Sequence, residues 1–306
     1  MKKIIKYYYD LVPEKVFHQK NIHKFIIEKT KYMLYEVNNE SEELEEKYKI
    51  QEYLNKINVC CNLIIKNKMG LIITQYNEKK FILIEQKIET RRINIMDILL
   101  LTSINIDNIG IKTIYRTDWK KMWEKKIDYI EHQIISNTDT KEIIKESIYY
   151  YIGLTENCIS ILQEPLEKKD KYKAICHERI GYKMTTDEFY NPINFIIDKR
   201  IRNFAEYIRG QLYNTPDKIE NIKKILDELL TKIRLNREEL ILLYARIVYP
   251  GEYFDIYEKI IMNLTNEKEL LKIINNSSKI EKNIKIIYEI LNKNKNIQPI
   301  EWLNKN

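Results

Sequence analysis

The spacing of apolar residues changes once along this chain, at about residue 90, and this change limits the fold more than any other feature. Before it, short β-prone runs alternate with polar turns, and after it apolar residues recur every three or four positions. The early β-prone runs cover residues 25–29, 32–37, 59–65, 71–76 and 81–84. We therefore predict an α+β protein of two lobes, with a small antiparallel sheet in residues 1–90 and a larger, mainly helical lobe in residues 91–292.

One helix is expected within the N-terminal lobe, from Ser41 to about residue 57. Ser41 is a favourable capping residue, and Glu42 and Glu43 follow it in the first turn, where they face the positive end of the helix dipole. Leu44 and Leu54 belong to an apolar stripe along the same segment. The N-terminal lobe should therefore combine several strands with one helix.

The helical pattern of the C-terminal lobe is interrupted once. Helices are expected at residues 201–213, 218–233, 237–248, 253–264 and 279–291, whereas residues 172–176 and 193–197 look extended. These two pieces flank a loop of about fifteen residues, and loops of that length in compact domains are usually functional or disordered. The loop is therefore a candidate for function. Residues 293–306 are expected to form a loose polar tail.

The formal net charge of +7 raises the question of nucleic-acid binding, because lysine and arginine gain affinity from phosphates. The lysines are scattered among glutamates and asparagines on predicted helix faces, and they do not form a strip interleaved with aromatic residues. Solvated helix faces explain this pattern better. Nucleic acid is therefore not an expected partner.

Membrane and secretory segments are not expected either. No apolar run approaches the roughly 18–20 residues that a membrane-spanning helix needs. Residues 1–9 lack the long apolar region and small-residue cleavage site of a secretory signal. Cys60, Cys61, Cys158 and Cys176 show no metal-ligand spacing, and their apolar neighbours favour reduced core cysteines. These observations predict a cytoplasmic protein.

The long loop and its flanks resemble known families. Residues 175–180 (ICHERI) resemble the catalytic loop of aminoglycoside-phosphotransferase-like kinases, and residues 194–198 (NFIID) resemble their metal-binding strand. Residues 200–209 (RIRNFAEYIR) and 242–254 (LLYARIVYPGEYF) are similar to stretches of spore coat proteins of the YutH and CotS type. The resemblance extends from about residue 115 to about residue 261 and includes the segment 156–158 (ENC). It implies a kinase-like two-lobed fold.

The residues that phosphoryl transfer requires can be sought at the positions that this resemblance indicates. Kinases use a flexible loop over the phosphates, a lysine on the third strand, an aspartate that accepts the substrate proton, and an Asn and an Asp that hold magnesium. The segment 10–24 contains no glycine for a phosphate loop, and Tyr35 stands nearest the lysine position. Arg179 replaces the proton-accepting aspartate, and Met184 replaces the asparagine. Asp198 alone retains the family residue.

Each residue of the degenerate loop also has a structural interpretation. Asp198 can coordinate magnesium, cap a helix or pair with the basic residues that follow it. Arg179 can hold an anion or pair with a neighbouring carboxylate, and His177 is typical of a scaffold histidine. Glu178, Asp187 and Glu188 are three other carboxylates of the loop, one of which would have to substitute for the missing aspartate if the chain is catalytic.

The leading interpretation is a noncatalytic, kinase-like spore coat or spore-associated protein that binds other proteins and needs no cofactor. One alternative is an active phosphotransferase with unusual catalytic residues, which would require ATP and magnesium. A second alternative is an anion or nucleic-acid binder. Its basic residues would be Arg179, Lys199, Arg200 and Arg202.

Overall fold

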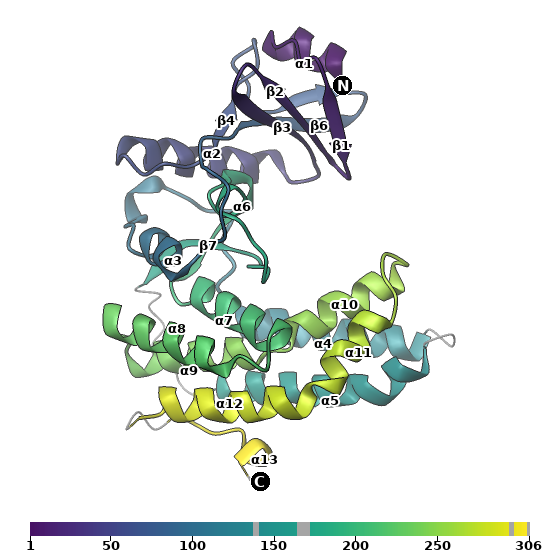
Figure 1. Cartoon of the computed structure of the whole chain (residues 1–306), viewed down its shortest axis with the longest axis vertical. Coiled ribbons are helices and arrows are strands. Elements are labelled where there is room, and N and C mark those ends of the chain that lie inside the picture. Colours follow the sequence, from purple (N-terminus) through teal and green to yellow (C-terminus); the bar gives the residue numbers. More distant parts are fainter. Residues whose placement is uncertain (137–140, 164–171, 294–296, 305–306) are drawn as a thin grey trace. The chain divides into compact units, whose positions relative to one another are not determined.

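The computed structural model describes residues 1–136, 141–163, 172–293 and 297–304. These residues form two compact units, whose elements are labelled in Figure 1. Unit 1 comprises residues 1–116, 173–178 and 183–198, and unit 2 comprises residues 117–172, 179–182 and 199–306. The first unit thus extends beyond the boundary expected after residue 90. It also includes two later segments from the long loop and its flanks, which sequence spacing does not reveal.

Unit 1 is built on a six-stranded sheet within the described residues, in which all pairings are antiparallel. The order is β1-β2-β3-β6-β4, and β5 also pairs with β6. The strands are β1 (Val16–Gln19), β2 (Ile22–Ile27), β3 (Thr30–Val37), β4 (Leu63–Ile65), β5 (Thr74–Tyr76) and β6 (Lys79–Glu85). The predicted antiparallel sheet is therefore confirmed, and β1 is a strand that the sequence pattern did not indicate.

The two faces of this sheet are covered by different helices. Leu44 of α2 (Ser41–Lys56) packs with Met33 and Ile82 on one face, and Ile5 of α1 (Lys2–Tyr9) packs with Leu34 on the other. This division follows from the two-residue period of a strand, which turns neighbouring side chains to opposite faces. Helix α2 matches the prediction closely. Helix α1 was not expected, because its eight residues are too few for a clear helical period.

The rest of unit 1 carries the long loop and its flanks. It contains α3 (Ile95–Thr102), η1 (Asp107–Ile109), β7 (Lys173–His177), α6 (Thr186–Phe189), η2 (Pro192–Asn194) and most of β8 (Phe195–Lys199). Strands β7 and β8 correspond to the two predicted extended pieces, and they pair as a separate two-stranded sheet. Backbone hydrogen bonds join Asn62 N to Tyr190 O (2.9 Å) and Thr186 N to Arg91 O (2.8 Å). These bonds fix the loop to the N-terminal residues.

Unit 2 is helical throughout its described residues, apart from loops and short extended segments. Its helices are α4 (Trp119–Ser136), α5 (Glu142–Ile161), α7 (Arg202–Asn214), α8 (Ile219–Lys232), α9 (Arg237–Val248), α10 (Gly251–Ile261), α11 (Lys268–Asn275), α12 (Ser277–Leu291) and α13 (Glu301–Asn304). Helix α9 packs against α5, α7 and α12, and its residues from Glu239 to Val248 are all buried. The five predicted helices are confirmed to within a few residues at each end.

The C-terminal residues differ from the loose tail that was expected for residues 293–306. Ile297, Ile300 and Leu303 are buried, and α13 packs against α12. Three apolar side chains on a short segment are enough to hold it against the helices, although its composition is polar. The remaining tail residues, 294–296 and 305–306, lie outside the described part of the chain.

The cysteines are all free thiols, and three of the four are buried. Cys60 is exposed, which contradicts the expectation that apolar neighbours place it in the core. Separately, none of the helices in the described ranges is long and apolar enough to cross a bilayer.

Candidate functional site

His177 ends strand β7 and is 1% exposed. Its Nε2 donates to the backbone O of Phe189 at 2.7 Å. The imidazole ring stacks on Phe189 with 4.3 Å between centroids and meets the Phe195 ring edge to face. A ring held in this way anchors the loop to β8. The position therefore agrees with the scaffold interpretation of His177.

Glu178 follows in unit 1 with a largely exposed side chain, and its carboxylate faces the Nε of Arg116 at 3.7 Å. Arg116 also donates to Glu43 of α2 at 3.0 Å. In kinases, the acid on this helix pairs with the third-strand lysine, whereas here Arg116 is its partner. One of the three acids that could substitute for the missing aspartate thus lies beside a cation.

Lys47 is a buried cation that the sequence analysis missed. It lies on α2 and donates from Nζ to the backbone O of Ile193 at 2.6 Å. Burial lowers the pKa of Lys47, while Glu43 and Glu178 act in the opposite direction. Lys47 follows Glu43 by one helical turn, so the sequence places both side chains on the same face of α2. No sequence signal indicates that the backbone O of Ile193 is the partner of Lys47.

Tyr35 lies on β3, where a kinase would carry its lysine. Its hydroxyl accepts a hydrogen bond from Asn191 Nδ2 at 3.0 Å. Burial raises the pKa of Tyr35 to about 12, and the carboxylates of Asp187 and Glu188 raise it further. The group is therefore a neutral phenol near neutral pH, and it supplies no positive charge for a phosphate.

The turn between β1 and β2 occupies the position of the phosphate-covering loop. Gln19 pairs with Ile22 across the hairpin, so only Lys20 and Asn21 form the turn. Lys20 adopts a φ of 55°, a left-handed conformation that glycine would take without strain. Asn21 is bound to β3 through its backbone O, which accepts from Glu36 N at 2.8 Å. Two residues without glycine, held to the next strand, leave little backbone to wrap around a phosphate.

Asp198 is fully buried on β8, and Met184 lies on the loop that precedes α6. A thioether is a poor ligand for magnesium, which prefers several oxygen donors in octahedral geometry. In the part of the chain that the structure describes, no group of three or more His, Cys, Asp and Glu side chains could hold a metal ion. Met184 therefore does not supply the oxygen ligand that a kinase has at this position, and Asp198 is the one family ligand that remains.

Arg179 belongs to unit 2, where it forms a bidentate ion pair with Asp255 of α10. The Nε lies 2.9 Å from Oδ2, and a terminal nitrogen lies 3.3 Å from Oδ1. Burial opposes the charge, but the carboxylates of Glu206 and Asp255 raise the pKa of Arg179 above its already high value. The residue at the proton-acceptor position is thus a permanent cation with a dedicated partner.

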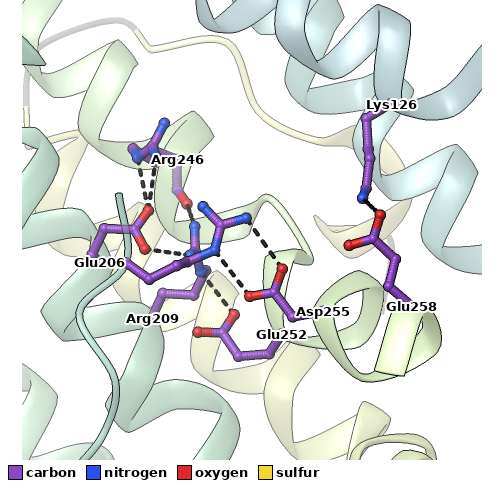
Figure 2. A network of polar contacts seen from close by, with 8 residues as sticks. Lys126, Glu206, Arg209, Arg246, Glu252, Asp255 and Glu258 are labelled. Carbon is purple, nitrogen blue, oxygen red and sulfur yellow. Dashed lines mark hydrogen bonds and ion pairs between the residues drawn. The ribbon is translucent and has the colours of Figure 1, made fainter. Parts of the chain in front are cut away.

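A separate network of charged residues, most of them buried, joins α7, α9 and α10 close to this pair (Figure 2). Glu206 lies between Arg209, whose terminal nitrogen is 2.6 Å away, and Arg246, whose Nε is 2.9 Å away. All three side chains are at most 3% exposed. Burial alone would raise the pKa of Glu206, but Arg209, Arg246 and two further arginines hold it at about 2.

The same network explains why residue 251 is a glycine. Arg209 Nε donates to Glu252 at 2.7 Å, and its guanidinium passes close to the start of α10. A Cβ on Gly251 would lie 3.1 Å from a terminal nitrogen of Arg209 and 3.2 Å from its central carbon. A side chain at Gly251 would therefore press on a buried cation that its carboxylate partners hold in place.

The network joins the two stretches that resemble spore coat proteins. Glu206 and Arg209 come from residues 200–209, and Arg246, Gly251 and Glu252 come from residues 242–254. In the sequence these charged residues are far apart, and their pairing across α7, α9 and α10 is not evident. The available signal was the pair Glu206 and Arg209, which are three residues apart on one helix and therefore neighbours on its surface.

The basic residues proposed as an anion site do not form one. Arg179 is paired with Asp255, and Arg200 donates to Glu239 at 2.5 and 2.9 Å while its guanidinium lies over the Tyr172 ring. Arg202 is 2% exposed. Lys199 also has an interaction partner. These cations are used within the protein, so they offer little to a phosphate backbone.

Comparison with solved structures places the fold. The AMP-bound spectinomycin phosphotransferase APH(9)-Ia is similar with a TM-score of 0.65 and 10% identity, over 94% of this chain and 96% of that chain. An aminoglycoside phosphotransferase from Alicyclobacillus acidocaldarius is similar with a TM-score of 0.63 and 9% identity, over 92% of each chain. At such low identity the similarity shows the fold alone, which is that of the kinase-like phosphotransferases.

Sequence comparison identifies the family. The family described as "Spore coat putative kinase YutH" matches residues 2–287, so the chain belongs to this spore coat YutH family. The endospore coat-associated protein YutH of Bacillus subtilis (strain 168) is 29% identical over 210 residues. That match covers 61% of this chain and 61% of the relative, which is less than two thirds of its length.

Proposed function

We propose that this chain is a noncatalytic member of its family, which associates with the spore coat and works by binding other proteins. The observation that carries the proposal is Arg179. Where the resemblance places a proton-accepting aspartate, the chain has a cation in a bidentate pair with Asp255. An arginine stays protonated at any pH at which the protein is folded, so it cannot accept a proton from a substrate hydroxyl.

Two further features support the proposal independently. Tyr35 provides a neutral hydroxyl where the α and β phosphates of ATP would need a lysine. The two-residue turn at Lys20 and Asn21 contains no glycine to approach a phosphate closely. Loss of one part would leave a weakened kinase, but loss of base, lysine and loop together removes both positioning and charge neutralisation.

Spore coat association comes from the family and from the name of the Bacillus subtilis relative, which is endospore coat-associated. Protein binding follows as the role that remains for a kinase-like fold in an assembled coat when its chemistry is missing. We propose that the chain is cytoplasmic before it is incorporated into the spore coat.

Transfer of labelled γ-phosphate from ATP, with magnesium, to water and to a panel of aminoglycosides, choline and casein tests the proposal. We expect no transfer above a blank without protein, with a known aminoglycoside phosphotransferase as the positive assay control. Transfer that is lost in Glu178→Gln or Asp198→Asn, in variants whose thermal unfolding matches the wild type, would show that the chain is an enzyme. Saturable thermal stabilisation of the wild type by ATP and magnesium would show that the chain binds nucleotide. That result would contradict the expectation that it needs no cofactor.

A further inference from the structure

An open groove of about 920 Å³ lies on unit 1, between α1 and the turn that precedes β5. One wall is formed by Lys3, Lys6 and Tyr7 of α1, and the other by Met69 and Tyr76. Figure 1 shows α1 beside the N-terminal sheet. We propose that this groove binds an acidic peptide segment, bearing apolar side chains, from a partner protein.

The groove is held open by contacts within unit 1. Lys68 N donates to the backbone O of Tyr8 at 2.8 Å, which joins the turn to the end of α1. Asn67 accepts from Met69 N and Leu71 N at 3.0 and 3.1 Å, and these bonds fix the turn itself. A groove with fixed walls does not need to be ordered when a ligand binds, which favours affinity.

The charge of the groove selects an acidic ligand. Its charged lining residues are Lys3, Lys6, Lys68 and Asp10, and the single carboxylate is already paired with Lys68 at 3.1 Å. Lys3 and Lys6 are exposed and have no carboxylate partner among the described residues. Two cations without partners on one helix attract a negatively charged segment and repel a basic one.

The groove also presents apolar surface that the fold does not need. Tyr7 is 66% exposed and Met69 is 62% exposed. Tyrosine and methionine are enriched at protein interfaces, where a rigid ring or a flexible thioether packs against apolar side chains. An acidic segment with leucine or aromatic residues would therefore gain contact area as well as charge pairing.

A membrane surface fits this groove less well than a peptide. A helix that binds lipid inserts its apolar face, but the apolar face of α1 is buried in its own unit through Ile5 and Tyr9. What α1 presents to solvent is lysine and tyrosine. The surface is also concave, so it matches a segment that enters it.

The inference rests on the proposal that the chain works by binding proteins, but it does not depend on the absence of catalysis. A phosphotransfer assay and a peptide-binding assay can therefore fail separately.

The test is selection of a phage-displayed library of random short peptides on the full-length chain. We expect enriched peptides to be rich in Asp and Glu with interspersed Leu or aromatic residues. Their binding, measured by fluorescence anisotropy with fluorescein-labelled copies, should weaken between about 50 and about 300 mM NaCl as the charges are screened.

Three variants locate the site. Lys3→Glu should weaken binding by about two- to fivefold, as loss of a surface ion pair implies. This change places an acid in the first turn of α1, which favours the helix, so weaker binding cannot be attributed to unfolding. Tyr7→Ser should weaken binding by about tenfold or more, as loss of an aromatic anchor implies. Lys49→Glu makes the same charge change at an exposed position of α2, away from the groove. This control variant should bind the peptide as the wild type does.

Enrichment of basic or uncharged peptides, absence of enrichment, or equal binding by Lys3→Glu and Lys49→Glu would each overturn the proposal. Binding to phosphatidylserine–phosphatidylcholine vesicles that is lost in Lys3→Glu, without acidic-peptide binding, would overturn it in favour of a membrane.

Discussion

Replacement of Glu206 by glutamine tests whether the buried charge network holds unit 2 together. Glutamine preserves the shape of the side chain but leaves Arg209 and Arg246 without their shared anion. A pKa lowered from 4.5 to about 2 in a fully buried group corresponds to about 3 kcal/mol of stabilisation. Breaking a buried ion pair by removing one partner costs a similar amount, about 3–5 kcal/mol. We therefore expect Glu206→Gln to destabilise unit 2 by about 3 kcal/mol at pH 7.

Urea unfolding followed by tryptophan fluorescence measures this loss in unit 2. The three tryptophans, Trp119, Trp123 and Trp302, all belong to that unit, and the Trp119 ring lies 4.4 Å from the guanidinium of Arg246. The matched control is Glu220→Gln, because Glu220 pairs with Lys223 at the same three-residue spacing but on an exposed surface. An exposed pair of this kind contributes about 0–1 kcal/mol.

The pH dependence provides a second measurement of the same effect. The pKa of Glu206 is lower in the folded than in the unfolded chain, so its stabilisation is complete above pH 4.5 and is lost as the pH falls towards 2. The wild type and Glu206→Gln should therefore differ most near neutral pH and converge at low pH. A loss below about 1 kcal/mol, or one equal to that of Glu220→Gln, would refute the reasoning.

Two further predictions concern the same unit. Gly251→Ala should destabilise it by about 1–3 kcal/mol, because the new methyl group would press on Arg209; Gly153→Ala, a helical position with no atom within 4 Å of the new Cβ, should instead stabilise it by about 0.5–1 kcal/mol. Equal effects of the two changes in urea unfolding would contradict the contact. Arg179→Asp should lower the melting temperature because it places a carboxylate beside Asp255, and the charge swap Arg179→Asp with Asp255→Arg should restore part of the loss. A swap no more stable than the single variant would show that the pair does not determine this local structure.

Sequence periodicity was sufficient for the elements whose apolar residues repeat clearly. Helix α2 and the five predicted helices of unit 2 have several turns each, and their buried stripes follow from a 3.6-residue period. Helix α1 and strand β1 are short, so their periods are ambiguous. The division into units was not predictable for another reason, because residues 173–178 and 183–198 pack with unit 1 through contacts far apart in sequence.

The residue types at the candidate site were predictable from the sequence, but their interaction partners were not. The family motifs are enough to find Arg179, Met184 and Asp198, because each occupies a fixed position relative to a motif, and the order of the strands is enough to find Tyr35. Which carboxylate each cation meets depends on tertiary packing. The partnership of Arg179 with Asp255, 76 residues away, therefore required the structure.

The environment of Arg179 explains why a cation suits this position. A proton-accepting aspartate at this position would lie beside Asp255, and Glu206 also acts on the charge of the residue there. Two or three carboxylates close together raise one another's pKa and destabilise the fold unless a metal ion or a cation compensates. Arg179 is such a cation, and its ion pair with Asp255 joins the chain after β7 to α10. The residue at the position of the proton acceptor therefore also contributes to the stability of the helical unit, whatever the activity of the chain.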